Sequence, residues 1–322
     1  MRERTSAGRS LALLATAAAT LILAACGSSS KTTSNSTPAS TTPASAATGP
    51  GAGKPAVTIG DKNFAEENIL GQLYAQALKA KGYTVNVKEN VGSTEIAYKA
   101  LTSGQIDMYP EYTGVLLSAI AGKTTNPSSA TAALAEARAF VAKENLTLLE
   151  PTPFYDSNVL ATLPAYAAAH HLASIADLAS LGKSVRLGGP PEFATRFEGL
   201  PGIQKEYGVN PTFVPIAIEL SYRALESKQV DVQNVFSTDG QLLGGQFKLL
   251  ADPKHVFGYQ NVAPIVRNSV LSAEGPEFAA TLNHVSSLLT IPAIQQMNKA
   301  VSIDKQSAVT VAAQFLKANG LA

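Results

Sequence analysis

The chain has 322 residues, of which 45% are hydrophobic and 15% charged, and its formal net charge is +1. This length and composition predict a globular body of about two domains, and the lack of a basic stripe argues against a nucleic-acid partner. Cys26 is the only cysteine, which excludes an intramolecular disulfide and a metal cluster held by cysteines.

The first 25 residues have the pattern of a secretory signal peptide. Three arginines precede the segment 10–25, which is almost wholly apolar or small and too short to span a bilayer comfortably, since about 20 residues are needed. The segment ends in Leu23-Ala24-Ala25-Cys26, which resembles the lipobox of bacterial lipoproteins. The resemblance implies that Cys26 is lipidated and becomes the first mature residue. The alternative is an ordinary signal peptide with an incidental cysteine.

Residues 26–55 are mainly Ser, Thr, Ala, Pro and Gly, and Lys31 and Lys54 are the only charged side chains among them. Such a segment cannot bury enough apolar surface to order itself. We therefore predict a disordered linker between the membrane anchor and the body.

The body alternates short strands with helices. A strand over 57–60 is followed by a helix over 65–80, in which apolar residues recur at helical spacing and Gly82 gives a stop signal. Further strands are predicted at 83–91, 146–149, 159–163, 185–188, 212–216, 247–250 and 262–267, and further helices at 129–143, 165–170, 174–180, 200–207, 275–289, 292–300 and 305–319. This alternation indicates an α/β architecture with largely parallel sheets.

Two stretches of the chain, 98–113 and 222–237, match without gaps at an offset of 124 residues and are identical at six positions. Each has the pattern of a helix end, a turn and a strand that ends in an aromatic residue, Tyr112 or Phe236, followed by a hydroxyl residue. The repeat predicts two similar α/β lobes with one aromatic side chain each at the carboxyl end of a strand, where such sheets bind ligands. Chance similarity between helix-turn-strand units is the alternative.

Several motifs in order resemble the substrate-binding proteins of osmoprotectant ABC importers, which bind glycine betaine, choline or carnitine. They lie at residues 59–70, 92–95, 109–114, 191–196, 237–239 and 258–259. The resemblance implies the type II periplasmic binding protein fold, with a hinge and an interlobe cleft. Lobe I would be 56–155 plus 260–322, and lobe II 156–259.

The resemblance also implies which residues hold a quaternary ammonium, which cannot donate a hydrogen bond and is held by aromatic faces. Tyr112 and Tyr259 match two of the family's four cage tyrosines. Phe236 stands at a third and keeps the ring without the hydroxyl. Asn158 stands at the fourth and opens one wall, so Asn158→Tyr is expected to strengthen glycine betaine binding. Val115 replaces a threonine, and the more open, apolar pocket favours a bulkier ligand such as carnitine.

Lys62 and Arg196 match the basic positions that would hold a ligand's carboxylate, for which the forked guanidinium of Arg196 is best suited. Taken singly, the aromatic residues Tyr112, Tyr259 and Phe236 would more often be packing residues, and the basic pair would more often be surface charges. Their occurrence together at matching positions after strand ends favours the binding role. Asp107 and Asp231, which lie before the repeat strands, are interpreted as structural.

Catalysis has little support in the sequence. The four histidines are scattered, and neither a Gly-x-Ser-x-Gly motif nor a phosphate-binding loop is present, so no enzyme activity, metal or cofactor is expected. The resemblance implies a monomeric receptor, lipid-anchored on the outer face of the cytoplasmic membrane, which delivers its solute to an ABC permease and its ATPase. The alternative is a surface lipoprotein of the same fold that binds an amino acid or aromatic compound, or acts as a sensor.

Overall fold

The computed structural model describes residues 48–321. The predicted signal peptide, Cys26 and the linker up to residue 47 lie outside the described residues. Among residues 48–321, no helix is both long and apolar enough to cross a membrane.

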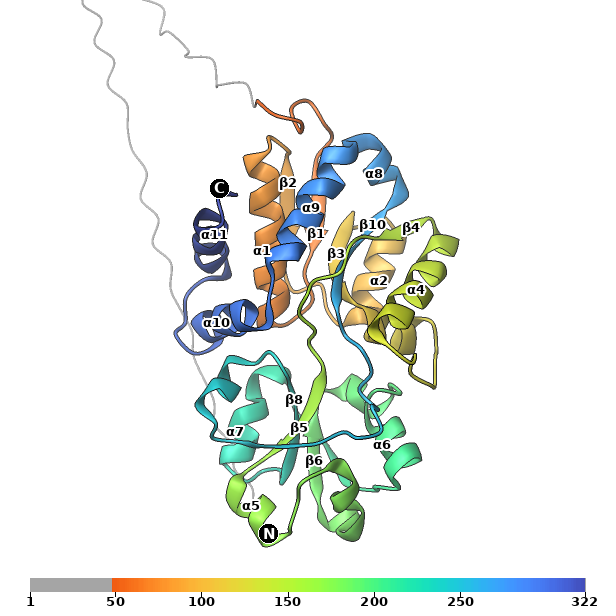
Figure 1. Ribbon diagram of the computed structural model, residues 1–322, viewed down its shortest axis with the longest axis vertical. Helices are drawn as coiled ribbons and strands as arrows, with labels where there is room; N and C mark the ends of the chain where they lie inside the picture. The colour runs from red at the N-terminus through yellow and green to blue at the C-terminus, as the bar shows by residue number, and fades with distance from the viewer. Residues whose placement is uncertain (1–47, 322) are drawn as a thin grey trace, which may run out of the picture. The chain divides into compact units, whose positions relative to one another are not determined.

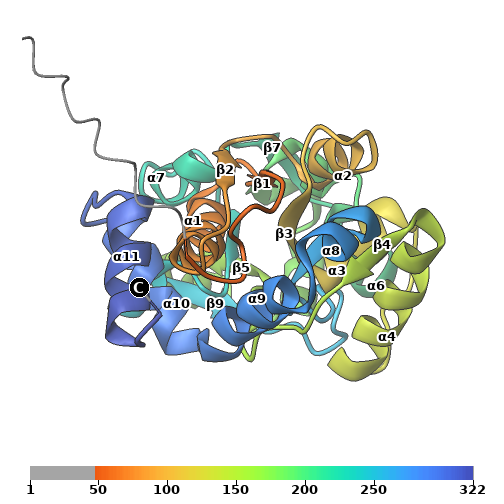
Figure 2. The ribbon, with the colours of Figure 1, turned by 90° about the horizontal axis from the view of Figure 1, so that it is seen from above.

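The first lobe is built on a mixed five-stranded sheet in the order β2-β1-β3-β10-β4 (Figure 1). Its strands are β1 (Val57–Gly60), β2 (Val85–Lys88), β3 (Met108–Tyr112), β4 (Leu146–Leu148) and β10 (Val262–Arg267). The helices around it are α1 (Ala65–Ala80), α2 (Thr94–Thr102), α3 (Thr113–Val115), α4 (Ala130–Val141), α8 (Asn268–Glu274), α9 (Pro276–Leu288), α10 (Ile291–Ser302) and α11 (Ala308–Ala318). Figure 2 shows α1, α10 and α11 on one side of these strands and α2 and α4 on the other.

The second lobe repeats this arrangement with the strand order β7-β6-β8-β5-β9. Its strands are β5 (Asn158–Thr162), β6 (Arg186–Gly189), β7 (Thr212–Pro215), β8 (Val232–Phe236) and β9 (Lys248–Leu250), and its helices are α5 (Pro164–Ala169), α6 (Leu200–Tyr207) and α7 (Ser221–Glu226). The predicted helix 174–180 is a 3-10 helix over Ile175–Ser180, capped by Ser174 as its sequence indicates.

The prediction of largely parallel sheets is only half right. In the first sheet β1 pairs in parallel with β2 and β3, but β10 is antiparallel to both β3 and β4. In the second sheet β5 is likewise antiparallel to β8 and β9. Strand β10 enters the first sheet from the second lobe, and β5 enters the second sheet from the first lobe. Each therefore runs antiparallel to the strands beside it.

The chain passes between the lobes twice, from β4 to β5 and from β9 to β10. The two passages are linked by an isolated antiparallel bridge between Tyr155 and Asn261. Separate apolar clusters are buried on the two faces of each sheet, and the largest includes α1 side chains such as Leu70 and Leu73, which are fully buried. Each lobe therefore has a core of its own.

The internal repeat corresponds to equivalent parts of the two lobes, which confirms the prediction of two similar α/β lobes. Asp107 accepts a hydrogen bond from the backbone N–H of Thr58 in β1, and Asp231 accepts one from that of Arg186 in β6, at 2.7 and 2.9 Å. Each aspartate is also paired with an arginine, Arg267 or Arg186. Each aspartate therefore connects the turn that precedes its strand to the neighbouring strand of the sheet.

The end of the predicted linker is ordered. The N–H of Gly51 donates to the carbonyl of Lys81 at 3.0 Å, and Lys54 Nζ donates to the carbonyl of Ala273 at 2.9 Å. Gly51 is buried, and a Cβ there would lie 2.3 Å from the backbone nitrogen of Tyr83. Composition indicated a disordered segment. Because glycine has no side chain, however, the backbone at Gly51 can lie close against the backbone of Tyr83.

Candidate functional site: a pocket between the lobes

A cavity of about 60 Å³ lies between the lobes and is lined by side chains from both. The first lobe and the passage between lobes contribute Lys62, Asn63, Phe64, Ser93, Thr94, Tyr112, Val115, Asp156 and Gln260, and the second lobe contributes Asn158, Pro190, Glu192, Phe193, Arg196, Glu198, Ile218 and Phe236. Five of the six predicted binding residues are therefore brought together.

Aromatic rings from both lobes meet in this pocket. The ring of Phe64 stacks on that of Phe236 with centroids 6.0 Å apart and 10° between planes, and it lies 6.0 Å from the ring of Tyr112. Phe64 was not predicted. It is the residue just before α1, within the motif 59–70, and its place at the end of a strand-to-helix loop was the available signal.

Tyr259 lies elsewhere, outside the residues that line the pocket. Its hydroxyl donates to the carbonyl of Ser128 at 3.2 Å, and its ring stacks on that of His255. The adjacent residue Gln260 lines the pocket instead, where its Oε1 accepts from the backbone N–H of Val115 at 2.9 Å. The prediction that Tyr259 lines the cleft does not agree with this conformation.

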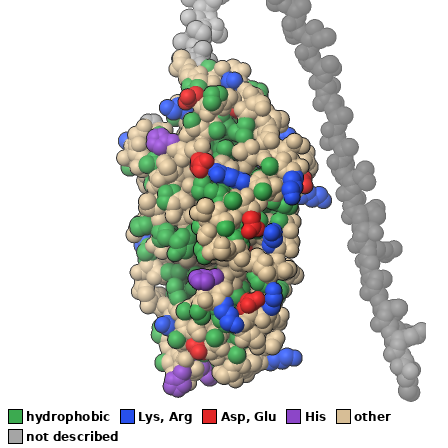
Figure 3. Space-filling model, turned by 45° about the vertical axis from the view of Figure 1, so that its right-hand side comes forward, with side chains coloured by type: hydrophobic (Ala, Val, Ile, Leu, Met, Phe, Trp, Pro, Cys, Tyr) green, Lys and Arg blue, Asp and Glu red, His purple; other side chains and the backbone are tan. Residues whose placement is uncertain are grey.

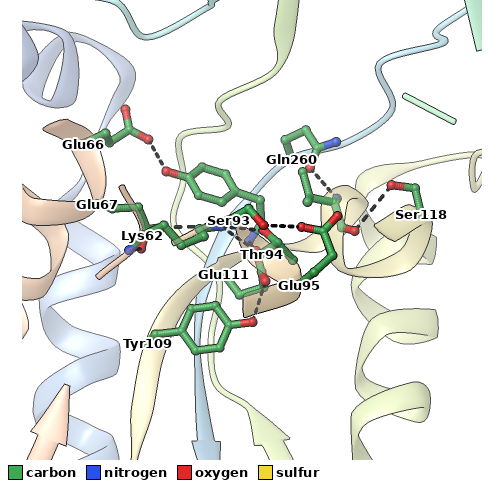
Figure 4. Close-up of polar contacts among 12 residues, drawn as sticks. Lys62, Glu66, Glu67, Ser93, Thr94, Glu95, Tyr109, Glu111, Ser118 and Gln260 are labelled. Atoms are coloured by element: carbon green, nitrogen blue, oxygen red, sulfur yellow. Dashed lines mark hydrogen bonds and ion pairs between the residues drawn. The ribbon is translucent and has the colours of Figure 1, made fainter. Parts of the chain in front are cut away.

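Lys62 is buried within carboxyl groups of the first lobe (Figure 4). Its Nζ lies 2.8 Å from Glu111 and 3.7 Å from Glu67, and 4.3 Å from the centroid of the Tyr112 ring. Burial raises the pKa of Glu67 to about 8 despite the nearby ammonium, so we assign the ion pair at pH 7 to Lys62 and Glu111. Lys62 lines the pocket, but its charge is already paired.

Tyr112 is held by contacts that also join the lobes. Its hydroxyl donates to Glu66 Oε1 at 2.7 Å, and Glu66 Oε2 accepts from Thr238 in the second lobe at 2.5 Å and from Asn298 in α10 at 2.7 Å. Burial raises the pKa of Glu66, and the three hydrogen bonds act in the opposite direction. The position of one ring is thereby coupled to the approach of the second lobe.

Arg196 pairs across the cleft rather than pointing freely into it. Its guanidinium donates two hydrogen bonds to Glu95 at the start of α2, at 3.0 and 2.8 Å. Burial alone would raise the pKa of Glu95, but the hydrogen bonds from Arg196 and Ser93 lower it to about 2. Glu95 thus occupies the bidentate position in which a ligand's carboxylate was expected.

Asn158 is not a simple gap in an aromatic cage. Its Nδ2 donates to the backbone carbonyl of Glu198 at 3.1 Å, and its Oδ1 accepts from Asn234 at 2.9 Å. The residue is paired with Phe236 across β5 and β8. Its amide therefore fixes the loop that carries Glu198 to the strand that carries Phe236.

Comparisons with known proteins agree with this architecture. A family model described as OpuAC, the substrate-binding domain of an ABC-type glycine betaine transport system, matches residues 55–318. A glycine-betaine-binding protein of Pseudomonas aeruginosa is 34% identical over 276 residues, which cover 82% of this chain and 88% of that protein. The glycine betaine-binding protein YehZ of Escherichia coli is 29% identical over 279 residues, covering 82% and 90%.

A solved structure of a glycine betaine/carnitine/choline ABC transporter is similar to this chain with a TM-score of 0.66 and 25% identity, covering 82% of this chain and 99% of that one. Two α/β lobes, two passages between them and a pocket lined by both define a two-lobed solute-binding protein. The chain belongs to the OpuAC family of substrate-binding domains of ABC-type glycine betaine transport systems. The family model and these relatives are described as binding components of transport systems.

Proposed function

We propose that this protein captures a quaternary-ammonium solute of the glycine betaine, choline and carnitine class in the interlobe pocket and delivers it to an ABC permease and its ATPase. The observation that carries the proposal is the meeting of Phe64, Tyr112 and Phe236 from two lobes in one pocket. Aromatic faces attract a cation that cannot donate hydrogen bonds, and each desolvated ring contributes roughly 0.5–2 kcal/mol.

Closure of the lobes about a hinge supplies the rest of the mechanism. We place the hinge at the two passages, near residues 155–156 and 259–260, where the Tyr155–Asn261 bridge links them. Lobe I, 56–155 plus 260–322, then carries Tyr112, and lobe II, 156–259, carries Phe236. Binding is expected to favour the closed arrangement because only there do rings from both lobes contact one ligand.

The proposal includes the setting of the protein. The lipobox-like sequence that ends at Cys26 supports a lipid anchor on the outer face of the cytoplasmic membrane, with the body acting as a monomer beside its permease. On the face shown in Figure 3, acidic and basic side chains are interspersed rather than gathered by sign, as expected from the low net charge.

Calorimetric titration with glycine betaine, choline and carnitine tests the proposal. We expect at least one of the three to bind, and Phe236→Leu to weaken that binding by roughly 0.5–2 kcal/mol, up to some thirtyfold, because a ring is lost. Phe315→Leu in α11 is the matched control, since this ring lies outside the pocket and away from the proposed hinge, and it should leave affinity unchanged. Failure of all three ligands to bind the unmodified protein would contradict the proposed function.

A further inference from the structure

The carboxyl group of Glu198 is buried in the pocket wall without a hydrogen-bond partner in the described part of the chain. The residue lines the pocket and is only 2% exposed, and neither of its carboxyl oxygens has a hydrogen-bond partner among residues 48–321. Buried polar groups are nearly always hydrogen-bonded, so an orphaned carboxyl in a pocket wall needs an explanation. A ligand that reaches this wall would supply the missing partner.

The residues around Glu198 fix its backbone but do not hydrogen-bond to its carboxyl group. Its backbone carbonyl accepts from Asn158, while the nearby guanidinium of Arg196 is taken by Glu95. The charged groups that act on it are Arg196, Glu95 from α2 and Glu111 from β3. The remaining charged residues of the pocket are Lys62, Asp156 and Glu192.

Protonation decides what such a group can bind. Burial raises the pKa of Glu198 to about 8, although Arg196 acts in the opposite direction. A protonated carboxyl donates a hydrogen bond and carries no charge, whereas the carboxylate only accepts hydrogen bonds and attracts cations. Near neutral pH the closed pocket can therefore present either form.

We propose that Glu198 contacts the polar group of the ligand and selects between two ligand types by its protonation. When protonated it donates to the carboxylate of a zwitterionic betaine. When ionised it repels that carboxylate and accepts a hydrogen bond from the hydroxyl of a cationic alcohol such as choline. This inference rests on the proposed function and names the residue that sets the order of preference within it.

The quaternary nitrogen carries its charge at every pH, and both ligands keep a fixed charge in the range of interest. As the pH rises through the pKa of Glu198, the bound carboxylate loses a donor and gains a repelling charge, while bound choline gains an attracting one. The ratio of the dissociation constants, glycine betaine over choline, should therefore increase with pH.

The test is calorimetric titration of the full body with both ligands at about pH 6.5 and about pH 9.5. In the unmodified protein we expect the ratio to increase about tenfold or more between these values. In Glu198→Gln, which cannot ionise, the ratio should stay constant. Glu192→Gln is the matched control, because it removes a carboxylate that lines the same pocket, and it should retain the increase.

The outcomes separate this inference from the function on which it rests. A ratio that is constant in the unmodified protein, or that still increases in Glu198→Gln, overturns the role of Glu198 while ligand binding supports the function. Such a persistent increase would assign the effect to another buried carboxyl near the pocket, Asp156 or Glu67, since burial raises the pKa of both. Binding of neither ligand by the unmodified protein at either pH would overturn both. If Glu198→Gln does not fold, Glu198→Met is titrated in its place, because it also cannot ionise and leaves no orphaned polar atom; an increase that persists in that variant overturns the role of Glu198.

Discussion

In the first lobe the pocket wall is built around a buried ion pair, whereas the wall in the second lobe combines an aromatic ring, an amide, two carboxyl groups and an arginine that reaches across. Lys62 lies between buried acidic side chains, and Tyr112 is anchored by buried Glu66. The second wall places Phe236 on a strand end and is held by the amide of Asn158. The first wall is therefore fixed by buried charges that are costly to separate, and the second by neutral hydrogen bonds whose loss costs less.

Removing the ammonium of the first wall should have the largest effect. Lys62→Met leaves Glu111 buried without its counter-ion, and we expect about 3–5 kcal/mol of lost unfolding free energy. Urea denaturation at pH 7 measures it. Adding Glu111→Gln should recover part of the loss, because the unpaired charge is then gone. Equal stability of the single and double variants would show that the pair is not the cause.

A change at Asn158 tests the second wall. The sequence led us to expect that Asn158→Tyr strengthens glycine betaine binding, but the amide joins Glu198 and Asn234, so we now expect weaker binding and a loss of about 1–3 kcal/mol in stability. Asn158→Ala separates the two causes, since it removes the hydrogen bonds without adding a ring. Tighter glycine betaine binding by the tyrosine variant would restore the original interpretation.

Weakening the contact between the two walls, which Arg196 makes with Glu95, should have the smallest effect. Arg196→Lys loses the bidentate geometry with Glu95, which is 42% exposed, so we expect no more than about 1 kcal/mol, decreasing at high salt. Because Arg196 pairs with Glu95 and not with ligand here, glycine betaine and choline should weaken equally in calorimetric titrations. A larger loss for glycine betaine would show that its carboxylate displaces Glu95.

The difference between the walls also explains what the sequence could reveal. Helix α1 begins and ends where its pattern predicts, and the repeat at Tyr112 and Phe236 located both strand ends at the pocket. These are local signals: apolar spacing, stop residues and turn chemistry. The antiparallel direction of β5 and β10 could not be predicted from these local signals, because it depends on the path of the chain between the two lobes.

The sequence also did not reveal which side chains would become partners. A lone sequence does not show that Arg196 meets Glu95 across a cleft, 101 residues away. Nor does it show that Tyr259 turns outward while Phe64 turns in, since both are aromatic residues in loops. Glu198 could have been noticed only as an acidic residue two positions after Arg196.

The position of β10 between β3 and β4 has a consequence for synthesis. Strand β4 ends at residue 148 and its neighbour β10 begins at residue 262, so a further 114 residues must be added before the two can pair. At about 5–20 residues per second this takes roughly 6–23 seconds. The second lobe, encoded within that interval, can fold on the ribosome first. The first lobe stays incomplete until the last part of the chain emerges, so truncation after β9 would leave a finished lobe attached to an unfinished one.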